Sequence, residues 1–453
     1  MAQLFSTERN NARSGWLAVL ALWTQTFVYI GIVKGVGIML PTLRYQFQTQ
    51  TWVIGWMAAL ILATSGLVGP FAGVLRKRFG TGIIIMVCGL MIGTGAIAGS
   101  LAATAPQLAA SLILLSGPGI GVMNVLAKDA IGRNVIKNYA QAVGVGKTGF
   151  SFGMIVYAPV IQLLLETYGW RATMLLTGGI SLNVVVCGAL LWSVRETIDQ
   201  QSDYQMVSHD EQYTPHLSSR LSVLTMTLKL ALKNLDVGLL GNSRYWSLAI
   251  ITCCNKFAYG MWLIYFVSQA ESTGFSLEDA AVFIAVGGVW NIVAKLGQGI
   301  IVDREILPCW GLMSIVCFIS SLSYCVSPWL FNYWAMMVAA SLIQFGDGVL
   351  TCLNDVLTRQ LLGADLLAGA YGWIGVKTAL LRILVSFIPE PQQVVLIEGT
   401  LFTSIIFKCI ISLRQVCGHC VMVLQKVPTP LLSSCNKPNM FFVCSRFTLR
   451  LDW

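Results

Sequence analysis

Charged side chains inside otherwise apolar segments are the residues of this sequence most able to do chemistry. A charge at bilayer depth costs at least ~2.5 kcal/mol on insertion scales, so each one marks a candidate site. Most are positive, and they are Lys34, Lys147, Lys256, Lys295, Lys377 and Arg382. The carboxylates at comparable positions are Asp347 and, in a less apolar segment, Glu398. A cavity with this excess of positive charge attracts an anion, and a carboxylate is the simplest choice.

Lys34 is the strongest candidate for lining such a cavity, because it lies deep in its apolar segment between Gly31, Gly35 and Gly37. For Lys147, which follows Gly146, cavity lining and close structural packing are both open. Three basic residues lie nearer the ends of their segments, and for these snorkelling to the headgroups is an equal alternative. They are Lys256, Lys377 and Arg382.

Asn291 and Lys295 lie four residues apart, so on a helix they share one face. Asn291 cannot titrate, and Asp347 is the clearest remaining carboxylate in this half of the chain that could. Tyr29 and Tyr259 are aromatic candidates for the pocket wall, although core packing or lipid contact is the simpler interpretation of either.

The elements that must position these residues are membrane helices. Hydrophobic residues make up 56% of the chain and charged residues 11%, against roughly a quarter charged in globular proteins. Apolar blocks of about 20 residues match the length of a transmembrane helix. They predict spans at 16–40, 51–75, 81–103, 107–127, 142–165, 171–194, 245–269, 279–302, 307–327, 330–354, 366–388 and 393–413, of which the last is weak.

The basic residues predict how these spans are oriented. Nearly all Lys and Arg outside the spans fall in the termini and in alternate loops, and the opposite loops hold only Arg44 and Arg171. This bias places the N-terminus in the cytosol. The predicted organisation is a cytoplasmic tail, a first bundle, a cytoplasmic linker, a second bundle and a cytoplasmic tail. Their bounds are 1–14, 15–194, 195–243, 244–413 and 414–453.

A loop motif recurs in the two predicted bundles, between the second and third span of each. The first copy contains Gly73-Val-Leu-Arg76-Lys77-Arg78, and the second reads Gly299-Ile-Ile-Val-Asp303-Arg304. Glycine permits close helix approach, and the charges pin the loop to neighbouring helix ends. The pattern resembles the signature loop of the major facilitator superfamily, although the first copy lacks the acidic residue. The resemblance implies an all-α fold of two six-helix bundles with a substrate site between them.

Three further segments, within a match over roughly residues 15–390, resemble the monocarboxylate transporter family, solute carrier family 16. They are Tyr29-Ile-Gly-Ile-Val-Lys34-Gly, Thr51-Trp52-Val-Ile-Gly-Trp56, and the turn Gly169-Trp170-Arg171 that leads to Leu182-Asn-Val-Val-Val-Cys-Gly. The resemblance implies that Lys34 binds substrate. The family pattern has an aspartate and an arginine at positions 291 and 295, a pair that the resemblance implies couples the proton to the carboxylate. This chain has Asn291 and Lys295 there, which predicts transport with little proton dependence.

These observations predict a transporter of small organic anions, with monocarboxylates as the first candidates. It is expected to work by alternating access in the plasma membrane. An aromatic amino acid, a thyroid-hormone-like compound or creatine is the alternative substrate. A non-transporting receptor or regulatory relative is the alternative of another class. The expected partners are the carboxylate substrate and the lipid bilayer, and an accessory single-span glycoprotein stays open.

Other functions find little support in the sequence. No nucleophile, metal cluster or pair of carboxylates at one depth predicts an enzyme, and no cofactor is expected. Cys417-Gly-His-Cys420 has the spacing of metal ligands but stands alone in the tail. Ser116-Gly-Pro-Gly-Ile-Gly121 lies in an apolar span, where it favours close helix packing over nucleotide binding. The net charge of +9 fits loops that face anionic lipid, so no nucleic acid is expected.

Overall fold

The computed structural model describes residues 2–49, 51–203 and 235–385, and every regular element in these ranges is helical. This confirms the all-α class predicted from the sequence. A helix satisfies all its backbone polar groups within one segment, which lipid requires. The first group of helices is α1 (Ala2–Phe47), α2 (Thr51–Leu67), α3 (Phe71–Phe79), α4 (Thr81–Ser100), α5 (Ala105–Ser111), α6 (Gly117–Asn134), α7 (Tyr139–Ser181) and α8 (Asn183–Asp203). The second is α10 (Ser243–Ser272), α11 (Leu277–Asp303), α12 (Cys309–Val326), α13 (Tyr333–Leu362) and α14 (Leu367–Val385).

Seven of the described helical segments are long and apolar enough to cross a membrane, or eight if the bent pair α2–α3 is one crossing. One of the seven, Tyr139–Ser193, has 55 residues, whereas about 20 suffice for one crossing. It breaks at Gly169, where φ is 75°. Before this glycine the helix packs along α1, and after it the chain packs along α4. This segment therefore has the length and the break for two crossings.

Short irregular turns link several helices. A single π-helical turn, Leu112–Ser116, joins α5 to α6, and 3₁₀ turns at Val237–Gly241 and Ser327–Trp329 precede α10 and α13. The first eleven predicted spans lie on helices, and the eleventh, 366–388, can be followed only to residue 385, where the described residues end. The twelfth predicted span, most of the linker and the C-terminal tail with its cysteines lie outside the described residues.

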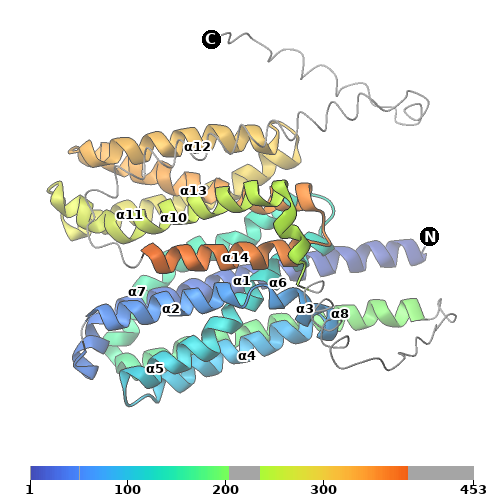
Figure 1. Ribbon diagram of the computed structural model, residues 1–453, viewed down its shortest axis with the longest axis horizontal. Coiled ribbons are helices and arrows are strands. Elements are labelled where there is room, and N and C mark those ends of the chain that lie inside the picture. Colours follow the sequence, from blue (N-terminus) through green and yellow to red (C-terminus); the bar gives the residue numbers. More distant parts are fainter. Residues whose placement is uncertain (1, 50, 204–234, 386–453) are drawn as a thin grey trace, which may run out of the picture. The chain divides into compact units, whose positions relative to one another are not determined.

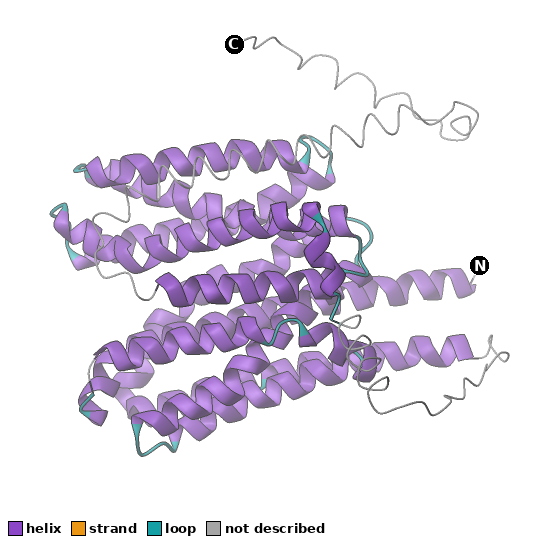
Figure 2. Ribbon diagram, viewed as in Figure 1, coloured by secondary structure: helices purple, strands orange, loops and turns teal. Residues whose placement is uncertain are grey.

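The described helices form two groups that meet along α7, α11 and α14. Figures 1 and 2 show α1–α8 in one group and α10–α13 in the other, with α14 between them. Helix α14 packs against α2 and α10, while α7 packs against α1 on one side and α11 on the other. Residues from both groups are thereby brought to a shared interface.

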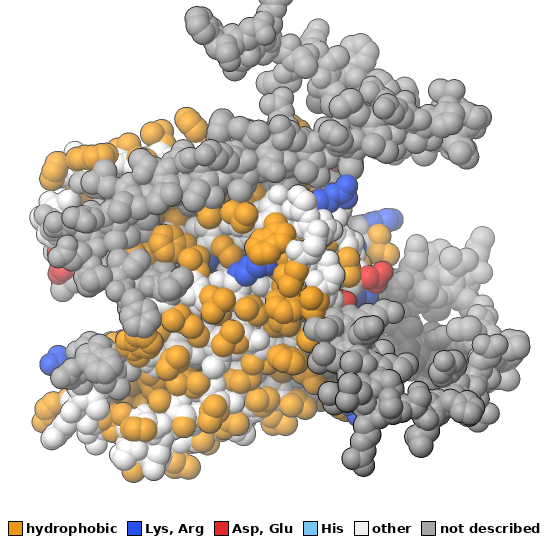
Figure 3. Space-filling model, in the orientation of Figure 1, with side chains coloured by type: hydrophobic (Ala, Val, Ile, Leu, Met, Phe, Trp, Pro, Cys, Tyr) orange, Lys and Arg blue, Asp and Glu red, His pale blue; other side chains and the backbone are white. Residues whose placement is uncertain are grey.

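The outer faces of the described helices are apolar. Large hydrophobic side chains are exposed on many of them, including Leu114, Leu163 and Phe318. Figure 3 shows hydrophobic atoms over most of the visible described surface, with few charges among them. A soluble monomer rarely exposes so much contiguous apolar surface. These faces therefore fit contact with lipid.

Close approach of α7 and α11 depends on glycine at the interface. A Cβ atom at Gly144 would collide with the backbone carbonyl of Lys295, and one at Gly299 would lie 2.6 Å from the Cα of Gln141. Small residues let the two backbones touch here. The contact brings Lys147 and Ser151 of α7 against the polar face of α11.

Candidate functional site

A cavity of about 330 Å³ lies between the two groups of helices. Its volume falls in the range of small-molecule sites. Helices α1, α7, α10, α11 and α13 supply its walls, which are mostly apolar. The polar lining residues are Lys34, Ser151, Tyr259, Asn291 and Gln344. Three of the residues predicted to bind substrate, Lys34, Tyr259 and Asn291, are therefore brought together.

Lys34 supplies the charge in this lining. It is half-buried on α1, and within the described ranges its ammonium has neither a hydrogen-bond nor an ion-pair partner. Gly31, one turn earlier, lies against the ring of Tyr157, so that α1 packs closely on α7 at this point. A half-buried cation with spare hydrogen-bond donors is suited to a carboxylate.

Lys295 lies behind the cavity wall, not in it. The residue is 2% exposed, and its ammonium donates to the hydroxyl of Ser151 at 2.7 Å and to the carbonyl of Lys147 at 3.2 Å. Ser151 in turn donates to Asn291 Oδ1 at 2.6 Å, and Asn291 Nδ2 donates to the carbonyl of Gln344. Asn291 and Lys295 thus share a face, as predicted, but only Asn291 reaches the cavity.

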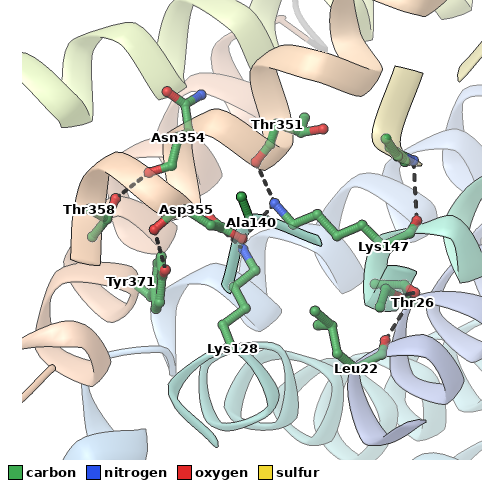
Figure 4. A network of polar contacts seen from close by, with 12 residues as sticks. Leu22, Thr26, Lys128, Ala140, Lys147, Thr351, Asn354, Asp355, Thr358 and Tyr371 are labelled. Carbon is green, nitrogen blue, oxygen red and sulfur yellow. Dashed lines mark hydrogen bonds and ion pairs between the residues drawn. The ribbon is translucent and has the colours of Figure 1, made fainter. Parts of the chain in front are cut away.

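Lys147 belongs to a buried ion cluster that joins the two groups of helices (Figure 4). Its ammonium lies 2.5 Å from Asp355 Oδ2 and also donates to the carbonyl of Thr351. Lys128 of α6 approaches Asp355 Oδ1 at 3.7 Å. The two lysines therefore hold one carboxylate of α13, and Lys147 packs in this cluster and is not among the residues that line the cavity.

Asp347 is buried, 4% exposed, and lies next to two side chains of α10. Asn255 Nδ2 donates to its Oδ1 at 3.4 Å, and the ammonium of Lys256 is 3.7 Å from the same oxygen. Asp347 is not among the residues that line the cavity. Lys256 thus has a carboxylate neighbour inside the protein. Snorkelling of its side chain to the lipid headgroups was the alternative left open by the sequence.

Tyr29 and the two basic residues of α14, Lys377 and Arg382, are not among the residues that line the cavity. The hydroxyl of Tyr29 accepts a hydrogen bond from Arg382 at 3.4 Å, and its ring is 6.4 Å from the ring of Phe150, a lining residue. Lys377 donates to the hydroxyl of Tyr245 at 2.6 Å and lies 4.0 Å from the centre of the Trp246 ring. These contacts tie α14 to both groups of helices.

The residues of the two loop motifs lie at one end of the helices, called the charged end below. Arg76 pairs with Asp129 at 3.1 Å, and Arg133 pairs with Asp129 at 3.0 Å and with Asp365 at 3.4 Å. The last pair joins α6 to the turn before α14, so it crosses between the groups. Gly73 is buried, and a Cβ added to it would lie 3.5 Å from the Cβ of Ala368, which is an ordinary contact.

Asp303 of the second loop copy caps helix α7. Its carboxylate accepts from the backbone N–H groups of Ala140 and Gln141 at 3.1 and 2.8 Å. A carboxylate at a helix N-terminus is favoured by the orphan N–H groups and the helix dipole. Arg78 and Arg304 are exposed, and Arg78 lies over the ring of Phe79.

The predicted turn residues lie at the opposite end. Gly169 takes the positive φ that the break in α7 requires. Trp170 packs edge-on against Phe47 of α1, and Arg171 donates to the carbonyl of Ala102 at 3.2 Å. Trp170 thus contacts α1 and Arg171 contacts the turn after α4, and none of the three is among the residues that line the cavity.

Gln344, Asp355 and Asp129 are important residues that sequence reasoning missed. Asp355 fell one residue beyond the predicted span 330–354. For Gln344 a signal was present, because polar residues of α13 recur at alternating spacings of three and four. They are Gln344, Asp347, Thr351, Asn354 and Thr358. That spacing marks one helix face, and all but the half-buried Thr351 are buried.

The part of the chain that the structure describes contains no group of three or more His, Cys, Asp or Glu side chains that could hold a metal ion. The cysteines Cys417 and Cys420 lie outside that part.

Comparison with known proteins points to one superfamily. Residues 22–386 match the sequence model described as Major Facilitator Superfamily. Monocarboxylate transporter 12 of Rattus norvegicus is 26% identical over 79% of this chain and 75% of its own length. Monocarboxylate transporter 11 of Mus musculus is 26% identical over 79% of this chain and 70% of its own. Among solved structures, the proton:xylose symporter XylE bound to 6-bromo-6-deoxy-D-glucose matches with a TM-score of 0.67 at 13% identity. The match covers 89% of this chain and 96% of XylE, and it shows the fold.

Proposed function

Since this chain belongs to the Major Facilitator Superfamily, as a multi-pass membrane transporter related to the monocarboxylate transporters, we propose that it carries small organic anions. Monocarboxylates are the first candidates. The observation that supports this most is Lys34, whose ammonium lines the cavity between the two groups of helices without a protein partner in the described ranges. The charge needs an anion, and mostly apolar walls fit a small organic one.

Alternating access is the mechanism we propose, and the interface between the groups supports it. At the charged end the groups are joined by the Arg133–Asp365 pair and by Asp303 on the start of α7. The ion cluster of Lys147 and Asp355 lies between that end and the cavity. Release of substrate toward the charged end would require these contacts to break. Interfaces held by such ion pairs switch between discrete arrangements, here a closed and an open one.

Aromatic amino acids, thyroid-hormone-like compounds and creatine are the substrate alternatives. Each carries an ammonium, an amine or a guanidinium group in addition to its carboxylate. A buried cation needs a counter-charge, and the described lining contains no carboxylate. The lining therefore favours the simple monocarboxylate. A receptor-like relative without transport is the alternative of another class, and an uptake measurement separates it.

Uptake by the purified chain in liposomes tests the proposed function. Labelled pyruvate or lactate should enter faster than in empty liposomes, and unlabelled monocarboxylates should compete. Neutral amino acids and creatine should compete weakly. Strong competition by creatine would reassign the substrate, and no uptake of any of these compounds would favour the receptor-like alternative. Because the chain is reconstituted alone, uptake would also show that an accessory glycoprotein is not needed for transport itself.

The plasma membrane and a cytosolic N-terminus belong to the same proposal, which the distribution of basic residues supports. An epitope inserted after residue 205, in the predicted linker, should be labelled only in permeabilised cells. An epitope after residue 273, at the turn between α10 and α11, should be labelled on intact cells. Labelling of the first epitope on intact cells would reverse the orientation.

Little proton dependence is expected for this transport. A proton-coupled carrier needs a group in the cavity that changes protonation between states, and Asn291 cannot do so. The nearby carboxylates Asp347 and Asp355 lie outside the lining and already face lysines. Initial uptake rates should be similar at mildly acidic and mildly alkaline outer pH, after correction for ionisation of the substrate.

Two variants sharpen this prediction. Asn291→Asp places a titratable group in the cavity wall, so it should add a pH dependence that the wild type lacks. Asp347→Asn should leave the flat profile of the wild type unchanged. A steep rise in wild-type uptake at acidic pH that Asp347→Asn removes would contradict the prediction and assign the proton to α13.

A further inference from the structure

Most polar side chains of the cavity wall form hydrogen bonds with one another or with neighbouring protein groups. Ser151 donates to Asn291 Oδ1 and accepts from Lys295. Asn291 Nδ2 donates to the backbone carbonyl of Gln344. Tyr259 donates its hydroxyl hydrogen to Gln344 Oε1 at 2.9 Å. These bonds use the hydroxyl of Ser151, the carbonyl oxygen of Asn291 and the only hydrogen that Tyr259 can donate.

Two side-chain nitrogens of the lining have no protein partner at all within the described residues, whereas Asn291 Nδ2 already donates one of its two hydrogens to the carbonyl of Gln344. One is the ammonium of Lys34, and the other is Nε2 of Gln344, which has no protein partner within the described residues. Gln344 is 2% exposed and lines the cavity. The cavity therefore offers a ligand one charged donor on α1 and one neutral donor on α13.

The amide of Gln344 is held in place from two sides. Tyr259 is 6% exposed, and its ring lies 6.0 Å from the ring of Trp262 on the same helix. It holds Oε1, so Nε2 is the atom left for a ligand. On the other side, a Cβ at Gly287 of α11 would lie 2.7 Å from Gln344 Cγ, so the side chain fills the space that this glycine leaves. A side chain held in one orientation in this way is suited to selecting a ligand by hydrogen bonding.

We infer that Gln344, oriented by Tyr259, is a specificity-determining residue that donates a hydrogen bond to a neutral oxygen of the substrate away from its carboxylate. This rests on the proposed function, in which Lys34 binds the carboxylate. A substrate with a methyl group in that position leaves Nε2 unpaired. A substrate with an ammonium group there meets a donor where it needs an acceptor. The favoured class is thus monocarboxylates that carry a distal keto or similar oxygen.

Three acids with the same five-carbon chain test this inference in liposomes. They are pentanoate, 4-oxopentanoate and 5-aminopentanoate, which carry no distal group, a neutral oxygen and a cation. The wild type should take up 4-oxopentanoate about tenfold faster than pentanoate at concentrations well below saturation, because a polar site rejects the analogue that lacks the matching group. It should take up 5-aminopentanoate more slowly than either.

Gln344→Met removes the donor at nearly constant volume. It should bring the uptake ratio of 4-oxopentanoate to pentanoate close to one by slowing the oxo acid, while pentanoate uptake persists. Gln162→Met is the matched control, because Gln162 is exposed on α7 outside the lining, and it should keep the wild-type ratio. An unchanged ratio in Gln344→Met would overturn the inference.

Tyr259→Phe is a second, independent variant. It frees Gln344 Oε1 and lets the amide turn, so the ratio should fall to an intermediate value. If Gln344→Met does not reach the membrane, an unchanged ratio in Tyr259→Phe overturns the inference. If the wild type carries all three acids without preference, the inference fails and the proposed function stands. If the wild type carries none of these or other carboxylates, both fail.

Discussion

Lys34→Ala is expected to lower uptake of small carboxylates by about tenfold to a hundredfold while leaving the amount of membrane-inserted protein unchanged. A hydrogen bond to a charged group contributes about 1.5–3 kcal/mol, and each 1.4 kcal/mol corresponds to about a factor of ten. In the described ranges Lys34 has no protein partner, so its removal breaks no internal ion pair. The loss should therefore fall on transport and not on folding.

Lys34→Arg should restore uptake only in part. It retains the positive charge, but the planar guanidinium is larger and presents its donors in a fixed fork. Lys137→Ala provides the matched control, since Lys137 is exposed in the loop before α7 and outside the cavity lining. Uptake and surface protein should be measured in the same cells. Wild-type uptake in Lys34→Ala would show that another residue binds the anion.

Asp355→Asn is expected to destabilise the protein by about 3–5 kcal/mol, because it leaves buried lysines without their counter-charge. Asp355 is 6% exposed and faces both Lys147 and Lys128. The variant should show a lower thermal unfolding temperature in detergent and less monodisperse protein. Adding Lys147→Gln to the same chain should recover much of the loss, because the second substitution removes one of the stranded charges.

Asp365→Asn is the matched control for this prediction. Asp365 also forms an ion pair, with Arg133 at 3.4 Å, but its side chain is 97% exposed. Pairs exposed to solvent contribute little to stability, so the unfolding temperature should barely change. Equal effects of Asp355→Asn and Asp365→Asn would refute the idea that burial makes the first pair critical. Failure of Lys147→Gln to rescue Asp355→Asn would show that Lys128 carries most of the interaction.

Local patterns in the sequence were enough to predict the fold class and the family. Apolar runs of about 20 residues imply membrane helices whatever surrounds them, because lipid leaves the backbone no other partner. The Gly169-Trp170-Arg171 turn and the Gly299–Arg304 loop are contiguous segments, so their role can be read without knowledge of distant contacts. The same is true of Lys34, whose depth and glycine neighbours marked it as a cavity residue and which lines the cavity in the structure.

Which of the buried charges remain available to a substrate was decided only by the tertiary structure. Lys34, Lys147 and Lys295 are all lysines inside apolar segments, and their sequence surroundings do not distinguish a free ammonium from a paired one. The difference lies in partners far along the chain: Asp355 for Lys147 and Ser151 for Lys295. Helical periodicity tells which residues share a face, but not which helix that face meets. Which side chains pair depends on which helices meet, and among the described residues this leaves the ammonium of Lys34 and Nε2 of Gln344 as the lining nitrogens without a protein partner.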